Sequence, residues 1–408
     1  MFCFFFFFFC LCKRNTLLHS TEPRWKQHSQ FLAALNDGNV PMAWTLLRGC
    51  EEPLVDPDVR IMTGGEYKPA ICIAVEKDLL DMAELLIMCG CSVNQSSPTG
   101  LSPLHIAVMR NNADMVRLLL KSGASVSCRD SNGRTPLHQL AVCNYGGNSL
   151  EIARLLVQKD SKTEYRDRNG ATPLALACKG HRALALCLLS LGANASAGDN
   201  EGNTPLHHTC AKVPNDEELV KHLLAAGAQV NKKNNRGMTA LSFAVLVHAS
   251  PAVVQSLMSN GADCNLYIKC WHQTILHRAI CIASYYQEWE SVKTFVRYGG
   301  NPFGQDRMGT TVVQYAMCKN KPLALWMTRA NPFMGAPRWC AWRVLYESWY
   351  DCTNEFNEKM LSELSSVPTL QRLCSLAFRS KYARHLDSPA FALSLPPRLL
   401  QHLRLCNL

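Results

Sequence analysis

The sequence predicts an all-α fold: a solenoid of helix–turn–helix units with short hairpin turns, followed by a small α-helical region. Three elements predict it. A Thr-Pro-Leu-His-like element recurs along the middle of the chain, a leucine-rich run closed by glycine follows it, and an Asp-x-x-Gly turn precedes it. The three elements stay in phase, and a fixed period of about 20 to 50 residues is typical of stacked repeats.

The Thr-Pro-Leu-His-like element predicts the first helix of each unit. Successive copies lie 33, 37, 32, 35 and 35 residues apart and begin at Ser102, Thr135, Thr172, Thr204, Thr239 and Thr274. Proline suits the first turn of a helix because its missing N–H would have no partner there. Apolar residues at helical spacing, such as Leu104, Ala107 and Val108, then give the helix one buried face.

The other two elements predict a second helix and the turn between units. Leu118 and Leu119 belong to its apolar face, and Gly123 ends it because glycine suits a left-handed C-cap. In one unit Asp160 stands at that position, and aspartate adopts this conformation less readily. The stretch 130–133 then makes a tight turn. Because one helix pair cannot bury its apolar face alone, the units are expected to stack.

These residues resemble the ankyrin repeat, and the resemblance covers residues 65–332 as about eight units. Around it we expect a disordered Phe/Cys-rich segment at 1–24 and an N-terminal cap or degenerate repeat at 25–64. A helical linker would follow at 333–366. Its tryptophans fit either an aromatic docking patch or, as we favour, packing against the repeats.

Four histidines recur at one position of the repeat: His105, His138, His207 and His277. Metal binding or catalysis would need these side chains to converge on one point. Recurrence once per unit instead favours a structural role, with each histidine hydrogen-bonding between neighbouring turns.

Residues 367–408 carry two short motifs. The first is an apolar stripe after the helix-start residues Pro368 and Thr369, at i, i+3, i+4, i+7 and i+8: Leu370, Leu373, Cys374, Ala377 and Phe378. The second lies around a Leu-Pro element: Leu393, Leu395, Pro396, Leu399 and Leu403. A stripe of this kind can be core, or it can be an anchor for a groove on another protein.

Both motifs, in this order after ankyrin repeats, resemble a SOCS box. The resemblance implies that the first motif binds Elongin C, which pairs with Elongin B. It implies that the second motif binds a cullin of the Cullin-five type with its RING protein. Three residues depart from the usual pattern, namely Ser375 for arginine, Ser394 for proline and His402 for tyrosine, and two of them weaken the expected cullin contact.

The resemblance also implies that the chain is the substrate-recognition subunit of a ubiquitin ligase and holds an unknown protein substrate on its repeats. Residues near the turns are the candidate contacts: Arg110, Asn111, Arg129, Arg134, Arg166 and Arg168. Several are basic, which fits an acidic partner, but solvated loop charges explain the same residues. The rival interpretation is a plain ankyrin scaffold whose last residues cap the stack.

Composition excludes other classes. The 408 residues are 48% apolar and 18% charged, which predicts a folded core. The net charge of +10 is dispersed, so it gives little support to nucleic-acid binding. None of the familiar catalytic or phosphate-binding motifs occurs. We therefore expect no catalytic residue, metal ligand or cofactor.

Cysteine usage and the N-terminus bear on location. The 20 cysteines include no C-x-x-C pair, and many lie in apolar runs, which indicates a reducing cytosol or nucleus. The run Phe2–Cys12 is too short to span a bilayer, which needs about 20 residues. A shallow anchor acylated at Cys3, Cys10 or Cys12 is the alternative to an inert tag.

Overall fold

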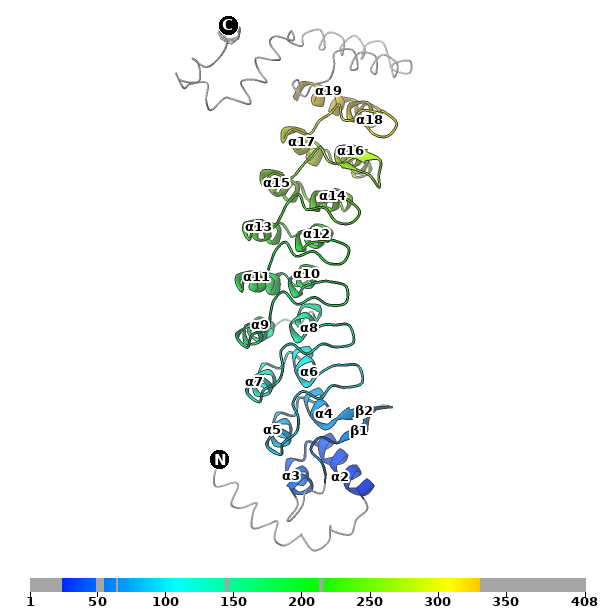
Figure 1. Ribbon diagram of the computed structural model, residues 1–408. Coiled ribbons are helices and arrows are strands. Elements are labelled where there is room, and N and C mark those ends of the chain that lie inside the picture. The colour runs from blue at the N-terminus through cyan, green and yellow to red at the C-terminus, as the bar shows by residue number, and fades with distance from the viewer. Residues whose placement is uncertain (1–23, 49–54, 64, 144–146, 213–215, 331–408) are drawn as a thin grey trace, which may run out of the picture. The chain divides into compact units, whose positions relative to one another are not determined.

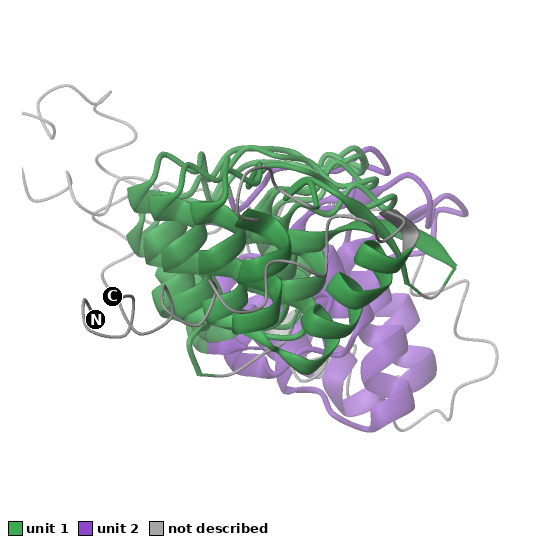
Figure 2. Ribbon diagram, turned by 90° about the horizontal axis from the view of Figure 1, so that it is seen from below, with its two compact units in different colours: residues 1–209, 218–229 green, residues 210–217, 230–408 purple. Residues whose placement is uncertain are grey.

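The computed structural model describes residues 24–48, 55–63, 65–143, 147–212 and 216–330. The predicted segments 333–366 and 367–408 lie outside the described residues, as does nearly all of 1–24. The chain divides into two compact units, residues 1–209 with 218–229 and residues 210–217 with 230–408 (Figure 2). We call them unit 1 and unit 2.

Unit 1 begins with one helix pair and continues as paired helices. The first pair is α2 (Arg24–Asp37) and α3 (Val40–Arg48). The next pairs are α4 (Ala70–Glu76) with α5 (Leu80–Met88), α6 (Pro103–Met109) with α7 (Ala113–Lys121), α8 (Pro136–Val142) with α9 (Ser149–Gln158), and α10 (Pro173–Ala177) with α11 (Arg182–Ser190). Unit 1 also holds most of α12 (Pro205–Cys210) and α13 (Glu217–Ala225).

Unit 2 has the same plan. Its described pairs are α14 (Ala240–Leu246) with α15 (Pro251–Ser259), α16 (Ile275–Tyr286) with α17 (Glu290–Arg297), and α18 (Val312–Lys319) with α19 (Lys321–Ala330). Within each unit the first helices of the pairs pack on one another and the second helices do the same, which makes two layers (Figure 1). The connecting loops extend from the layer of first helices.

Two short antiparallel hairpins interrupt the helices. In unit 1, β1 (Arg60–Thr63) pairs with β2 (Glu66–Pro69), with Arg60 opposite Pro69. In unit 2, β3 (Tyr267–Ile268) pairs with β4 (Gln273–Thr274). Each hairpin stands where the other repeats carry their Asp-x-x-Gly turn, so the hairpins extend a loop rather than add a sheet layer.

Local sequence sets the helix ends. Pro103, Pro136 and Pro173 each occupy the first turn of a first helix. The second helices end at a residue with positive φ, which is +85° at Gly123 and +66° at Asp160. The predicted left-handed C-cap is confirmed, including the aspartate that replaces glycine in one repeat.

The core lies between the two layers. Leu104, Met115, Leu119 and Leu137 are all less than 2% exposed. Leu118, which the sequence placed on the same apolar face as Leu119, is only half-buried. The described cysteines form no disulfide with one another, and four that lie in apolar stretches of the sequence are buried: Cys72, Cys178, Cys187 and Cys210. Their role as small apolar core residues is therefore confirmed.

Candidate protein-interaction surface

The loops that precede the first helices form a repeated hydrogen-bonded structure. We call them the finger loops: residues 92–101, 125–134, 162–171 and 194–203 in unit 1, and residues 230–238, 263–274 and 301–310 in unit 2. In the second loop, Asp130 Oδ1 accepts hydrogen bonds from the backbone N–H groups of Asn132 and Arg134, both at 2.8 Å. Gly133 N–H donates to the Asp130 carbonyl at 2.9 Å. The predicted Asp-x-x-Gly turn is thus closed by its own aspartate.

Neighbouring finger loops are joined backbone to backbone. Arg168 N–H donates to the Asn132 carbonyl at 3.0 Å, and Asn200 N–H donates to the Asn169 carbonyl at 2.9 Å. These bonds require the backbones of the two loops to approach each other closely, and glycine allows this because it has no Cβ. A Cβ built on Gly170 would lie 2.8 Å from the backbone nitrogen of Asn200.

The recurrent histidines connect one repeat to the next. His105 Nε2 lies 2.9 Å from the Arg134 carbonyl, and His138 Nε2 lies 3.1 Å from the Ala171 carbonyl. Because a carbonyl only accepts, Nε2 carries the proton and Nδ1 is the acceptor. In His138, Nδ1 takes hydrogen bonds from the Thr135 backbone N–H at 3.2 Å and from the Thr135 hydroxyl at 2.8 Å. The structural role predicted for these histidines is confirmed.

Buried histidines link stability to pH. Burial is the main cause that lowers the pKa of His105, His138 and His277 below the ordinary value of 6.5. Below about pH 6.5 the unfolded chain therefore binds more protons than the folded chain, and the free energy of unfolding decreases as the pH falls. Above that pH this contribution is fully present.

We expect the urea midpoint of unfolding to fall as the pH is lowered from about 6.5 towards 5, because these imidazoles must be neutral in the folded chain. Circular dichroism at a series of pH values measures it. His138→Gln removes one of the groups and should flatten the slope. A midpoint that rises on acidification through this range would contradict the expectation.

A further set of inter-repeat contacts had no counterpart in the sequence prediction. Asn94 lies beside the end of the following second helix, where its amide donates to the Gly123 carbonyl at 3.4 Å and its Oδ1 accepts from Ser125 N–H at 2.8 Å. Asn231 makes the same pair of bonds at Gly261 and Asp263 in unit 2. The sequence did contain a pattern that could have predicted these contacts, namely asparagine at corresponding positions of several repeats.

The structure brings four of the six candidate basic or polar residues together in adjacent finger loops of unit 1. Arg129 Nη1 donates to the Arg166 carbonyl at 2.8 Å, and the guanidinium of Arg129 lies 5.5 Å from the Tyr165 ring centroid. Arg166 Nη1 in turn donates to the Gly198 carbonyl. Both arginines therefore tie one finger loop to the next, although their side chains are exposed.

Arg134 and Arg168 differ in what they contact. Arg134 Nε lies 3.8 Å from Oδ2 of the buried Asp167, which is an ion pair beyond hydrogen-bond distance. Arg168 is exposed, and its backbone rather than its side chain makes the loop contact. Of the four finger-loop arginines, Arg168 is the one whose side chain makes no hydrogen bond or ion pair with a described residue.

The other two candidates lie elsewhere. Arg110 and Asn111 form the turn between α6 and α7, at the opposite end of α6 from its finger loop. Asn111 adopts a left-handed conformation with φ +55°, and its carbonyl accepts from Asn148 Nδ2 at 3.2 Å. They do not share a surface element with the finger-loop arginines.

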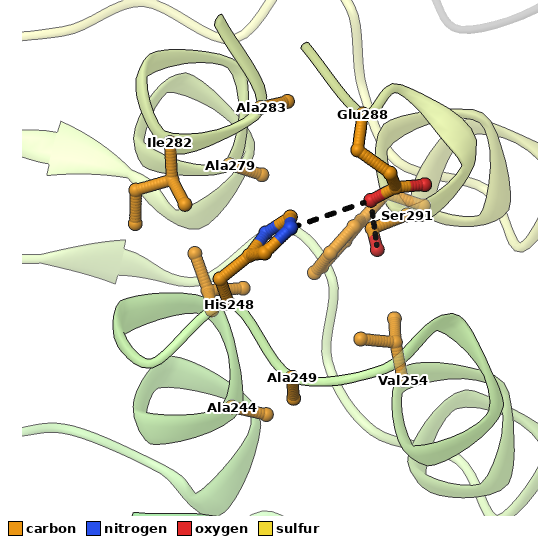
Figure 3. A pocket seen from close by; sticks show the side chains of 11 residues that line it. Ala244, His248, Ala249, Val254, Ala279, Ile282, Ala283, Glu288 and Ser291 are labelled. Carbon is orange, nitrogen blue, oxygen red and sulfur yellow. Dashed lines mark hydrogen bonds and ion pairs between the residues drawn. The ribbon is translucent and has the colours of Figure 1, made fainter. Parts of the chain in front are cut away.

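Unit 2 has a shallow hollow between the turns of two neighbouring helix pairs (Figure 3). Alanine and valine side chains line it, and His248 and Glu288 lie at its polar side with Nε2 and Oε2 3.8 Å apart. Its volume of about 280 Å³ includes space open to solvent. Ligand pockets usually reach about 300 Å³ or more of enclosed space, so the hollow gives no support for a small-molecule site.

The described residues contain neither a metal-binding cluster nor a membrane-spanning helix. No group of three or more His, Cys, Asp or Glu side chains there could hold a metal ion. No helix in the same part of the chain combines the length and apolar character needed to cross a bilayer.

The residues predicted for Elongin and cullin contacts lie outside the described residues. They are Leu370, Leu373, Cys374, Ala377, Phe378, Leu393, Leu395, Pro396, Leu399 and Leu403. Their assignment remains a prediction from the sequence.

Paired helices, aspartate-closed finger loops and histidine bridges define a repeat protein of the kind that binds other proteins. The family model for ankyrin repeats (three copies) matches residues 30–130, 71–167, 123–199, 141–234 and 208–281. These stretches together span 30–281, which is more than half of the 408 residues. The chain belongs to the ankyrin-repeat family, and the predicted ankyrin fold is confirmed.

A curated relative shares part of this region. The chain is 27% identical over 232 residues to the human "Ankyrin repeat and SOCS box protein 16". The match covers 56% of this chain and 42% of the relative, so it spans less than half of that protein's own length.

Proposed function

We propose that this chain is the substrate-recognition subunit of an Elongin B/C–cullin–RING ubiquitin ligase. The observation that carries the proposal is the pair of motifs at residues 370–378 and 393–403, which follow an ankyrin-repeat array. The printed name of the human relative, which joins ankyrin repeats to a SOCS box, supports the same assignment.

In this proposal the apolar stripe from Leu370 to Phe378 binds Elongin C. Leu370 and Cys374 are four residues apart, a spacing that would place both side chains on one face of a helix. An amphipathic helix of this kind can lay its apolar face into a groove of a partner. The second motif, with Leu399 and Leu403, then recruits the cullin and its RING protein.

The repeats hold the protein substrate. The finger loops and the exposed parts of the first helices are the surface on which such arrays bind partners. The chain itself has a non-catalytic role, since it places lysines of the substrate near the conjugating enzyme. Such placement raises the effective concentration of the reacting groups, and the expected result is ubiquitination and degradation of the substrate.

Replacing Leu370 and Cys374 by alanine is expected to abolish co-purification of the full chain with Elongin C. Truncation of a buried apolar anchor commonly costs about 2 kcal/mol or more in binding, and the variant removes two such anchors. The measurement is affinity purification of the tagged chain followed by quantification of Elongin C.

The control is Gln371→Ala with Ser375→Ala, which changes two residues of the same segment that are not part of the stripe. This control should bind Elongin C normally. Undiminished recovery of Elongin C with the Leu370/Cys374 variant would refute the ligase assignment and leave an ankyrin scaffold for protein–protein interaction as the function.

A further inference from the structure

Unit 2 contains two arginines whose guanidinium groups lie over tryptophan rings, and one of the two also pairs with a carboxylate while the other does not. Arg297 lies 6.0 Å from the centroid of Trp326, and its Nη1 donates to Glu290 Oε1 at 2.8 Å. Arg278 lies 5.7 Å from the centroid of Trp271. No carboxylate among the described residues forms an ion pair with Arg278, and its buried Nε has no hydrogen-bond acceptor there.

Arg278 lies where a first helix meets its finger loop. It is in the first turn of α16, directly after the bridging His277, while Trp271 belongs to the finger loop 263–274. Removing a guanidinium nitrogen from water without an acceptor has a cost, and a buried polar group of this kind calls for an explanation. A carboxylate from a partner would not reach the buried Nε, but it would meet the outer nitrogens of the half-buried guanidinium and supply the countercharge that the described residues lack.

The neighbouring ionisable groups among the described residues do not form an ion pair with Arg278. Tyr315 Oη lies 3.0 Å from Cys281 Sγ, and this contact together with burial raises the pKa of Tyr315 to about 12. The phenol therefore stays neutral at physiological pH. Asp306, in the next finger loop, uses its Oδ1 to accept backbone N–H groups at 2.8 and 2.9 Å.

The next finger loop lies against this one and exposes an apolar side chain. Arg307 N–H donates to the His272 carbonyl at 3.0 Å, so the loops 263–274 and 301–310 lie against each other. Met308 in the second of these loops is 85% exposed, and Tyr267 in the first is 41% exposed. Tryptophan, tyrosine, arginine and methionine are the side chains most enriched at protein interfaces.

The charge of this surface matches an acidic partner. The three finger loops of unit 2 contain two acidic residues, Asp263 and Asp306, and Oδ1 of each accepts backbone N–H bonds. Their five basic residues are Lys232, Lys233, Arg236, Lys269 and Arg307. The loops are therefore net positive before Arg278 is added.

We propose that Arg278 and Trp271 are the anchor for an aspartate or glutamate on a segment of the partner protein, with an adjacent apolar residue of that segment packed on Met308. The planar guanidinium can donate two parallel hydrogen bonds to a carboxylate while Trp271 holds its plane. This inference rests on the proposed function, because it names the chemistry of the substrate segment that the repeats would hold.

The test uses the purified full chain, a random peptide library, and the variants Arg278→Gln and Arg297→Gln. The unaltered chain should select peptides with an acidic residue next to an apolar one. A selected synthetic peptide should bind Arg278→Gln at least about tenfold more weakly. It should bind Arg297→Gln as well as it binds the unaltered chain, since that arginine already has Glu290 as its partner.

A double-mutant cycle sharpens the result. Changing the acid of the peptide to its amide should weaken binding to the unaltered chain but have little further effect on Arg278→Gln. If the glutamine variant does not fold, Arg278→Lys keeps the charge. It should still bind more weakly, because lysine cannot make the planar two-donor contact.

Peptides selected without acidic residues, or equal binding by Arg278→Gln, would overturn the inference. So would binding of single-stranded RNA that depends on Arg278 when no acidic peptide is selected. None of these three results would contradict the ligase assignment, because Elongin C recovery with the Arg278 variants is measured separately and is expected to be normal.

Discussion

Gly170→Ala is expected to lower the free energy of unfolding by about 3 kcal/mol or more, the sum of a backbone term and a steric term. Gly170 has φ +72°, which costs an alanine about 1 kcal/mol. The added Cβ would also lie 2.8 Å from the backbone nitrogen of Asn200, so the two finger loops would have to separate. The hydrogen bond from Asn200 N–H to the Asn169 carbonyl would be lost with that movement.

Gly237→Ala is the matched control. Gly237 occupies the same loop position with φ +75°, but nothing lies within 4 Å of the Cβ that would be added. This variant should lose only the backbone term of about 1 kcal/mol. Urea unfolding followed by circular dichroism compares the two. Equal losses would show that contact between neighbouring finger loops contributes nothing to stability.

Much of the fold follows from the sequence because its repeated elements act locally. Proline at the helix start, glycine at the C-cap and aspartate in the turn each determine the conformation of residues within about one turn of themselves. Asp160 illustrates this, since its position in the repeat was enough to predict a left-handed conformation, and its φ is +66°. Recurrence likewise indicated the structural role of the histidines.

The inter-repeat contacts could not be predicted in the same way, because they depend on which carbonyl of a neighbouring loop comes within reach. Arg129 and Arg166 stand at the same position, one residue before the turn aspartate. The sequence predicts them as substrate contacts or as solvated loop charges, and neither interpretation includes the bonds that their side chains make to the carbonyls of the neighbouring loop. Arg278 shows the converse, since it does not recur and has no carboxylate partner among the described residues.

The second large effect is expected from His138→Ala, which should lower the free energy of unfolding by about 3 kcal/mol. The imidazole is fully buried, and its removal leaves the Thr135 N–H and hydroxyl without the Nδ1 acceptor. The Ala171 carbonyl loses the Nε2 donor and keeps only the hydrogen bond from Asp167 N–H. The variant therefore weakens the start of α8 and its connection to the next finger loop together. Urea unfolding at pH 7.5 (about one unit above the ordinary histidine pKa) measures this loss without a contribution from protonation.

His138→Gln separates the two contributions, and the chain itself suggests the choice. At the corresponding position of α18, Gln314 Oε1 accepts from the Thr311 backbone N–H at 2.7 Å and from its hydroxyl at 3.1 Å. Glutamine can therefore satisfy the helix start, but it is not expected to reach the Ala171 carbonyl as the imidazole does. We expect His138→Gln to lose about half as much stability as His138→Ala, since one lost hydrogen bond costs about 1 kcal/mol. A loss below about 0.5 kcal/mol for the alanine variant, which is the range of ordinary surface substitutions, would contradict the structural role of the histidine.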